Sequence, residues 1–266
     1  MSRMRFSIIV VTLNAGEELI NTVKSCMNQT FADKEIVIKD GMSTDGSLEK
    51  VKEIATGNVQ IISEPDKSIY DGMNRAIKDA KGDYLIFMNA GDSFADDKVL
   101  AHVAKHMIKH DADIYYGNMY RRGSNTLISY PEKMTEFGLY RNVPCHQVCF
   151  YSRRLFEKKA YDLKYPIRAD YEHFLRSVYE YKAVLSHIDI PVCIYEGEGF
   201  SERKDNKAKS MMEHREITSR YMGIKTVMYR GIMIITLQPL REKIAGSKAF
   251  SGIYQKIKTL IYKVIK

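Results

Sequence analysis

The sequence predicts an α/β protein, a Rossmann-like, mostly parallel sheet flanked by helices, on two observations. Short β-branched runs alternate with amphipathic segments over the first 120 residues, which is typical of βαβ units with right-handed crossovers. Each run also ends in a polar turn, most of them containing glycine. With 45% hydrophobic and 28% charged residues, the 266-residue chain has the composition of a globular protein with a sizeable core. A disordered tail, a collagen-like fibre and a disulfide miniprotein are excluded.

The expected elements follow from the spacing of apolar side chains. Residues 6–13 form a continuous apolar run, as in a strand buried on both faces, and residues 17–29 repeat apolar side chains at helical spacing. The other strands expected in the first half are 35–39, 59–63, 83–88 and 113–120, and the helices are 47–55, 69–80 and 96–110. In the less regular second half we expect strands at 148–151 and 183–195 and helices at 171–181 and 208–221.

Polar side chains follow each of the first four strands. Because the carboxyl ends of parallel strands meet at one edge of a sheet, these turns are expected to form the ligand site. Any one of these turns could be an ordinary turn or helix cap. Four such turns in succession at the same sheet edge are not explained in this way. Gly41 and Gly46 have the spacing of a P-loop, yet Ser47 and Leu48 follow where lysine is required, and no dinucleotide fingerprint follows the first strand. An NTPase and an NAD enzyme are therefore disfavoured.

Four segments resemble family 2 inverting glycosyltransferases of the GT-A (nucleotide-diphospho-sugar transferase) fold. They are SIIVVTLN (7–14), IVIKDGMSTDGS (36–47), SEPDKSIYDGMNRAI (63–77) and IFMNAGD (86–92). The third resembles the branch found in bacterial capsule, exopolysaccharide and O-antigen synthesis, and the match runs in order over about residues 6–200. The resemblance implies a nucleotide-sugar donor (usually a UDP-sugar), a divalent metal (Mn²⁺ or Mg²⁺) and transfer with inversion.

The nucleotide is expected at six residues of the first half: Thr12, Asn14, Asp40, Ser43, Asp71 and Asn74. The Asp40 carboxylate can accept the imide N–H of uracil. Thr12 and Asn14 can hold the base and ribose. Asp71 and Asn74 lie in the first turn of the next helix, whose N-terminus favours a diphosphate.

Asp92 lies where the family has its metal-binding acid. The commoner Asp-x-Asp pattern is not kept, because Asn89 and Gly91 occupy the two acidic positions. That departure leaves the number of metal ligands, and metal dependence, open. The alternative is that Asp92 only caps the following helix.

The family supplies its catalytic base from a Glu-Asp pair at the head of a helix. Here Asp170 corresponds to the base and Ala169 replaces the glutamate. The alternative for Asp170 is an ordinary N-cap. His146 and Gln147 resemble a His-Gln pair that faces the donor sugar or acceptor. Zinc is disfavoured at Cys145 and Cys149, because no second ligand pair lies nearby.

Positive charge is concentrated at the C-terminal end. The chain has 41 Lys+Arg against 33 Asp+Glu, and the last 26 residues carry +6 of the formal net charge of +8. Apolar residues recur at helical spacing over 253–265 with lysines between them, as in a helix at an anionic membrane surface. A terminal helix packed on the domain, or a dimer contact, is the alternative. We expect a GT-A domain at 1–222 (nucleotide-sugar-binding half 1–120, acceptor-binding half 121–222) and a basic amphipathic, helical C-terminal extension at 223–266.

The sequence thus predicts a glycosyltransferase that uses a lipid-linked or oligosaccharide acceptor in bacterial cell-surface polysaccharide synthesis. No apolar stretch approaches the ~20 residues of a membrane span, so we expect a cytoplasmic protein, peripheral at the inner face of the membrane. Two alternatives remain: a nucleotide-sugar-binding protein without transfer activity, and a nucleic-acid-binding protein that uses the basic tail. We expect no nucleic-acid partner, and the sequence leaves an oligomer open.

Overall fold

The computed structural model describes residues 5–124, 126–195 and 204–235. The chain divides into two compact units, residues 1–217 and 218–266. The boundary at residue 222 stays a prediction. The basic amphipathic helix predicted over residues 253–265 lies outside the described residues.

The first unit contains a mixed sheet in the order β3-β2-β1-β4-β8-β6-β9-β5, with β7 paired to β6. The strands are β1 (Phe6–Thr12), β2 (Lys34–Asp40), β3 (Val59–Ser63), β4 (Tyr84–Asn89), β5 (Ser93–Phe94), β6 (Ile114–Arg121), β7 (Thr126–Ile128), β8 (Cys149–Ser152) and β9 (Leu185–Tyr195). The helices are α1 (Gly16–Met27), α2 (Ser47–Ile54), α3 (Ile69–Asp79), α4 (Val99–Met107), α5 (Glu136–Arg141), α6 (Arg154–Glu157), α7 (Ala169–Tyr179), α8 (Lys207–Met222) and α9 (Lys225–Ile235). Short 3₁₀ turns lie at His146–Val148 and Lys204–Asn206.

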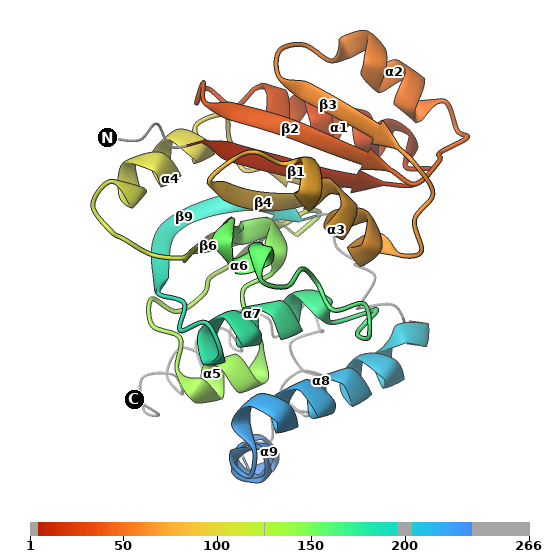
Figure 1. Ribbon diagram of the computed structural model, residues 1–266. Coiled ribbons are helices and arrows are strands. Elements are labelled where there is room, and N and C mark those ends of the chain that lie inside the picture. The colour runs from red at the N-terminus through yellow and green to blue at the C-terminus, as the bar shows by residue number, and fades with distance from the viewer. Residues whose placement is uncertain (1–4, 125, 196–203, 236–266) are drawn as a thin grey trace. The chain divides into compact units, whose positions relative to one another are not determined.

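The predicted fold class is confirmed. β1 to β4 run parallel and lie side by side (Figure 1), and β1 is buried along its whole length, as its uninterrupted apolar run indicates. β6 and β9 are also parallel to each other. The short strands β7 and β5 pair antiparallel with β6 and β9, and β8 lies antiparallel between β4 and β6. A four-residue apolar run carries no information on strand direction, so the sequence did not show this insertion.

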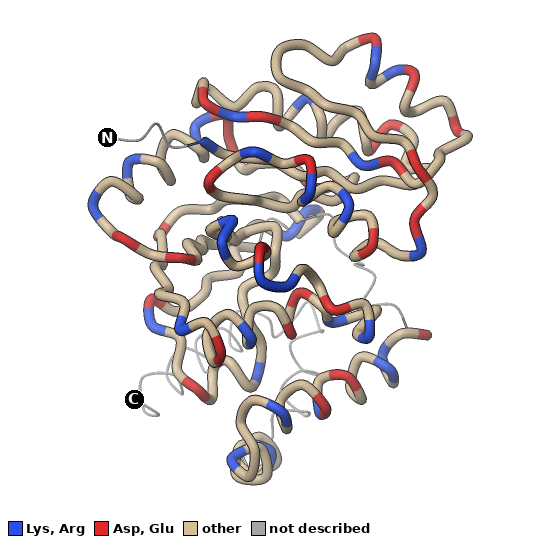
Figure 2. The backbone as a smooth tube through the Cα atoms, viewed as in Figure 1, with Lys and Arg blue, Asp and Glu red and all other residues tan. Residues whose placement is uncertain are grey.

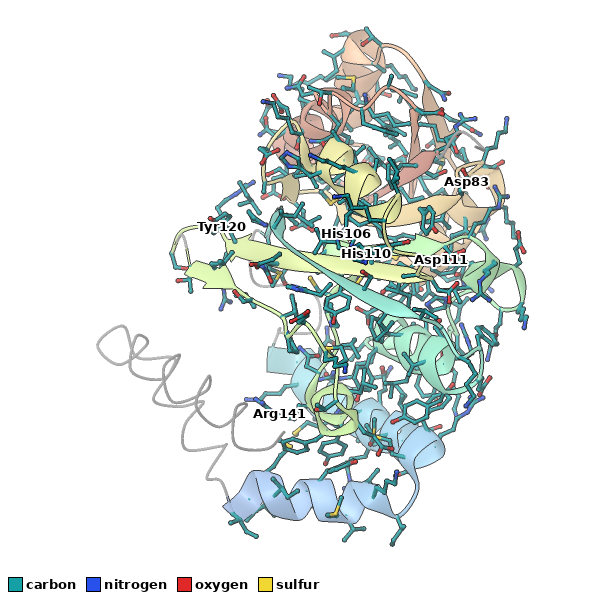
Figure 3. All side chains as sticks on the ribbon, turned by 90° about the vertical axis from the view of Figure 1, so that its left-hand side faces the viewer. Asp83, His106, His110, Asp111, Tyr120 and Arg141 are labelled. Carbon is teal, nitrogen blue, oxygen red and sulfur yellow. The ribbon has the colours of Figure 1, made fainter. Side chains whose placement is uncertain are left out.

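Helices cover the sheet, and charged side chains lie on both the helices and the loops. Lys and Arg alternate with Asp and Glu along the helices and loops of residues 5–217 (Figure 2). At the end of α4, the rings of His106 and His110 stack 4.2 Å apart, and the ring nitrogen Nε2 of His106 lies 2.8 Å from the Ser186 hydroxyl on β9 (Figure 3). This contact fixes α4 to the strand it covers. None of the helices that the structure describes is long and apolar enough to cross a membrane.

Candidate active site

The carboxyl ends of β1, β2 and β3 lie in register at one edge of the sheet. Thr12 pairs with Asp40, and Asp40 with Ser63, while Asn89 at the end of β4 pairs with Val11. At this edge the Oγ1 atom of Thr12 and the Oδ1 atom of Asn89 are buried without a hydrogen-bond partner. Buried polar atoms nearly always have a partner, so two unpartnered oxygens at one edge mark the place where a ligand would supply the missing partners.

Asp40 is the centre of a hydrogen-bond network between two loops. Its carboxylate is fully buried and accepts bonds from the backbone N–H groups of Met42 and Ser43 and from the hydroxyls of Ser43 and Ser63. The Ser43 hydroxyl in turn accepts a bond from the backbone N–H of Asn14 at 2.8 Å. The structure thus brings Asn14, Asp40 and Ser43 together beside Thr12. Asp40 uses its oxygens to hold the loop, so a bond from a uracil imide requires exchange of one of these donors.

Asp71 and Asn74 lie on α3, which begins after the N-cap Ser68. Burial pushes the pKa of Asp71 up, but the backbone N–H of Lys67 and the charge of Arg75 outweigh it and lower the pKa below its ordinary value. The Asn74 amide pairs with both backbone groups of Tyr161, at 2.9 Å each. Asn74 therefore ties α3 to the second half of the chain rather than to the loop network.

The turn after β4 holds Asp92. The Thr22 hydroxyl of α1 accepts a bond from the Gly91 N–H at 3.0 Å and donates to the Asp92 carbonyl at 2.7 Å. Gly91 has φ 103°, a region that favours glycine, which gives a local reason for the loss of an acid at this position. The Asp92 side chain is buried, and its Oδ2 accepts a bond from Gln147 Nε2 at 3.0 Å. Two residues singled out in the sequence, 55 positions apart, thus meet.

Asp170 lies in the first turn of α7 and is held by two other elements. The Tyr70 hydroxyl of α3 donates to Oδ1 at 2.9 Å, and His146 Nδ1 lies 3.1 Å from Oδ2. Burial would raise the pKa of Asp170, but the hydrogen bonds from His146 and the Tyr70 hydroxyl outweigh it, so the pKa is lowered. The side chain remains 24% exposed. Asp170 is therefore an accessible carboxylate that is ionised at neutral pH.

His146 connects this carboxylate to the edge of the sheet. Asn89 Nδ2 lies 3.2 Å from His146 Nε2. An amide nitrogen can only donate, so Nε2 is the acceptor and the ring proton is on Nδ1, where it is donated to Asp170. A chain of hydrogen bonds thus runs from the end of β4, through His146, to the start of α7.

One comparison of the sequence with protein families is decisive. Residues 7–177 match the sequence model of the family described as glycosyl transferase family 2. The chain belongs to this family. The PGL/p-HBAD biosynthesis glycosyltransferase of Mycobacterium bovis is 32% identical over 200 residues, which cover 73% of this chain and 78% of that protein.

Two solved structures share the fold of this glycosyltransferase. S. aureus TarS 1–349 in complex with UDP-GlcNAc has a TM-score of 0.65 at 18% identity and covers 85% of this chain and 70% of its own. Mannosyltransferase PcManGT from Pyrobaculum calidifontis, in complex with GDP-Man and Mn²⁺, has a TM-score of 0.63 at 13% identity and covers 100% of this chain and 87% of its own. At these identities the likeness shows the fold alone, and it agrees with the GT-A prediction.

The turn after β4 offers this glycosyltransferase few ligands for a divalent metal. In residues 5–124, 126–195 and 204–235, no group of three or more His, Cys, Asp or Glu side chains gathers to hold an ion. The unpartnered Oδ1 of Asn89 and the Asp92 carboxylate belong to the same turn and are both hard oxygen donors. That pair fits Mg²⁺ or Mn²⁺, which bind to a protein through one or two groups and take their other ligands from a phosphate and water.

Sequence analysis missed two residues that support the glycosyltransferase site. Tyr70 is described above. Lys39 is fully buried, and its Nζ donates to the carbonyls of Asp40 and Glu64 at 2.6 and 2.5 Å and lies 3.3 Å from Asp66. It therefore fixes the end of β2 against the segment after β3. A lysine inside the apolar run of β2 was the available signal, because a buried ammonium needs several acceptors.

Proposed function

We propose that this glycosyltransferase transfers one sugar from a nucleotide-diphosphate donor, a UDP-sugar, with inversion, to a hydroxyl of a lipid-linked or oligosaccharide acceptor in bacterial cell-surface polysaccharide synthesis. The observation that carries the proposal is the ionised, partly exposed Asp170, oriented by Tyr70 and His146 and joined through His146 to the sheet edge. A protein that only binds nucleotide sugars has no need of an oriented carboxylate on the acceptor side.

Asp170 acts as the general base. The acceptor hydroxyl gives its proton to the carboxylate as its oxygen attacks the anomeric carbon. The bond from that carbon to the diphosphate breaks on the opposite face, and the nucleoside diphosphate leaves with the electron pair. The lowered pKa keeps Asp170 ready to accept a proton at neutral pH.

The nucleotide occupies the edge formed by β1 and β2. Thr12 Oγ1 is the unpartnered buried acceptor there, and Asn14 and Ser43 belong to the loop network that Asp40 holds. Asp71 is assigned to the same donor site because α3 begins next to it, and Asn74 by its place in the same first-half motif. TarS and PcManGT, which share the fold, are solved with UDP-GlcNAc and GDP-Man, which supports a nucleotide-sugar donor.

A divalent metal, Mn²⁺ or Mg²⁺, would be held by Asn89 and Asp92 and would neutralise charge on the leaving diphosphate. The presence of Mn²⁺ in the PcManGT structure supports this assignment. Gln147 orients Asp92 through its 3.0 Å hydrogen bond, and His146 faces the sugar or the acceptor from the same 3₁₀ turn.

The segment 223–266 is proposed to contact the inner, anionic face of the membrane. It contains nine of the 41 cations and one of the 33 anions, so the rest of the chain carries 32 of each. Within it, α9 has no acid and exposes apolar side chains, among them Val227 (66% exposed), Ile234 (61%) and Ile235 (80%). Apolar exposure together with positive charge is the pattern of an interfacial helix, and it would place a cytoplasmic enzyme beside a lipid-linked acceptor.

The test is the release of nucleoside diphosphate from a panel of UDP-sugars, with and without lipid-linked acceptors, by the wild type and by Asp170→Asn. Loss of a general base typically costs about 10²–10⁴-fold in turnover, and UDP binding should be unchanged. Asp162→Asn is the matched control, because that carboxylate pairs with Lys159 on the surface of the same half. If Asp170→Asn transfers sugar at the wild-type rate, the base assignment is wrong.

A further inference from the structure

The backbone just before Asp170 is held by a carboxylate that lies outside the residues matched by the family. Glu213 on α8 is buried, with 6% of its surface exposed, and lies beyond the matched residues 7–177. Its Oε2 accepts hydrogen bonds from the backbone N–H groups of Ile167 at 3.1 Å and Arg168 at 2.8 Å. These two residues immediately precede α7, which starts at Ala169.

The N-cap residue of α7 makes no side-chain capping bond. Asp170 accepts a bond from the N–H of Tyr171 at 2.8 Å, but Ala169 offers no acceptor, so the N–H of the N-cap, Arg168, needs one from elsewhere. Glu213 supplies it from a different helix, and a carboxylate is favoured there by the helix dipole. Burial raises the pKa of Glu213, and its other oxygen, Oε1, has no hydrogen-bond partner among the described residues. Burying a carboxylate costs desolvation free energy, and the only bonds of Glu213 given by the described residues go to this turn. Its burial here therefore indicates that it holds the turn in place.

The same turn is bonded from the opposite direction. The single proton of the Tyr70 hydroxyl is shared between the Ile167 carbonyl, 3.1 Å away, and the Asp170 Oδ1 atom, 2.9 Å away. Arg168 Nε donates to the carbonyl and hydroxyl of Ser210, one turn before Glu213 on α8. α3 and α8 thus hold residues 167 and 168 between them, three and two positions before the base.

We propose that Glu213 is a positioning residue for Asp170: by fixing the backbone of residues 167 and 168 it sets the place of the carboxylate relative to the acceptor hydroxyl. This inference rests on the proposed role of Asp170 as the base. It makes α8 a functional part of the enzyme.

Glu213→Ala should lower kcat and leave the KM for the UDP-sugar unchanged. Two backbone N–H groups lose their acceptor, and a displacement of about 1 Å at a catalytic group can cost about 10²-fold, so we expect a loss of about 10- to 100-fold. Glu213→Gln should recover most of the rate, because one amide oxygen can accept both bonds that now go to Oε2. Rescue by the amide distinguishes positioning from a role of the charge.

Glu216→Ala is the matched control. Glu216 lies on the same helix three residues later and pairs with Lys164 on the surface, and it makes no bond to residues 167 and 168. Its loss should leave kcat within about twofold of the wild type, since an exposed ion pair contributes little. If Glu213→Ala does not fold, Glu213→Met fills the same volume without an acceptor and gives the same comparison.

The experiment measures UDP release from UDP-GlcNAc, UDP-glucose and UDP-galactose by the full chain, with Asp170→Asn in parallel. A kcat loss in Glu213→Ala or Glu213→Met that Gln rescues supports the inference. If Asp170→Asn is inactive but Glu213→Ala and Glu213→Met keep the kcat of the Glu216→Ala control, or lose activity only through KM, the inference is overturned and the proposed function stands. Full activity of Asp170→Asn overturns both.

Discussion

Tyr70→Phe removes one hydroxyl that joins the two halves of the enzyme. Tyr70 is buried on α3, and its hydroxyl donates to Asp170, 100 residues further along the chain, at 2.9 Å. A hydrogen bond to a charged group contributes about 1.5–3 kcal/mol. Asp170 is 24% exposed and keeps the contacts with His146 and its own helix, so water replaces part of the loss. We therefore expect the free energy of unfolding to fall by about 1–2 kcal/mol.

The pH dependence of this loss has a definite sign. The folded-state pKa of Asp170 is depressed, so its contribution to stability is present above the unfolded-state pKa of about 3.9 and disappears as the pH falls through the folded value. Removing the Tyr70 donor brings the folded pKa closer to the ordinary value. The penalty of Tyr70→Phe should thus be constant from pH 8 to about pH 5 and shrink below about pH 4.

Thermal unfolding of the wild type, Tyr70→Phe, Asp170→Asn and the double variant measures the coupling. For a protein of this size, about 1–2 kcal/mol lowers the melting temperature by roughly 2–8 °C. Tyr165→Phe is the control, because Tyr165 is equally buried but donates to Glu216, whose side chain is 51% exposed. The reasoning is refuted if Tyr70→Phe melts at the same temperature as the wild type at pH 7. It is also refuted if the penalty does not shrink as the pH is lowered below about 4, or if it is equally large in the Asp170→Asn background.

Two further predictions concern the metal turn and the C-terminal segment. Gly91→Asp restores part of the Asp-x-Asp pattern. Because φ is 103° at this position, it should destabilise the protein by about 1–3 kcal/mol and leave the Mn²⁺ affinity no higher than in the wild type. Thermal unfolding and calorimetric titration with Mn²⁺ check this, and a clear gain in affinity contradicts it. The full chain should sediment with phosphatidylglycerol vesicles and less with phosphatidylcholine vesicles. The double variant Ile234→Glu, Ile235→Glu should bind phosphatidylglycerol vesicles only weakly, because both side chains are exposed on α9. Stronger binding of the full chain to duplex DNA at the same salt concentration favours the nucleic-acid alternative.

The ends of the first four strands were predictable because their signal is local. Continuous apolar runs marked β1 and β2, and the polar residues directly after them had to share one edge once the strands were parallel. Register alone then brings Thr12 and Asp40 together. What the sequence did not show is that the Asp40 oxygens already accept bonds from Met42, Ser43 and Ser63, because the partners of a buried carboxylate depend on how separate segments fold together.

Contacts between the halves were not predictable, because nothing in the periodicity links residues a hundred positions apart. Asn74 illustrates this, since its place at a helix start indicated a phosphate contact whereas its amide pairs with the backbone of Tyr161. Glu213 is a second example of a long-range contact that the sequence does not show. A glutamate on a predominantly polar helix is expected to be solvated, and only the fold shows that Glu213 is buried against the turn that precedes α7.

The departure from Asp-x-Asp has a physical consequence at its first position. Asn89 Nδ2 donates to His146 Nε2, which leaves the ring proton on Nδ1, facing Asp170. An aspartate at position 89 would have no N–H to give and would attract the ring proton to Nε2. A neutral His146 would then present a lone pair to Asp170 and lose that contact, or the ring would have to carry a second proton. The amide therefore lets a neutral histidine orient the base, while its Oδ1 still offers an oxygen to a cation.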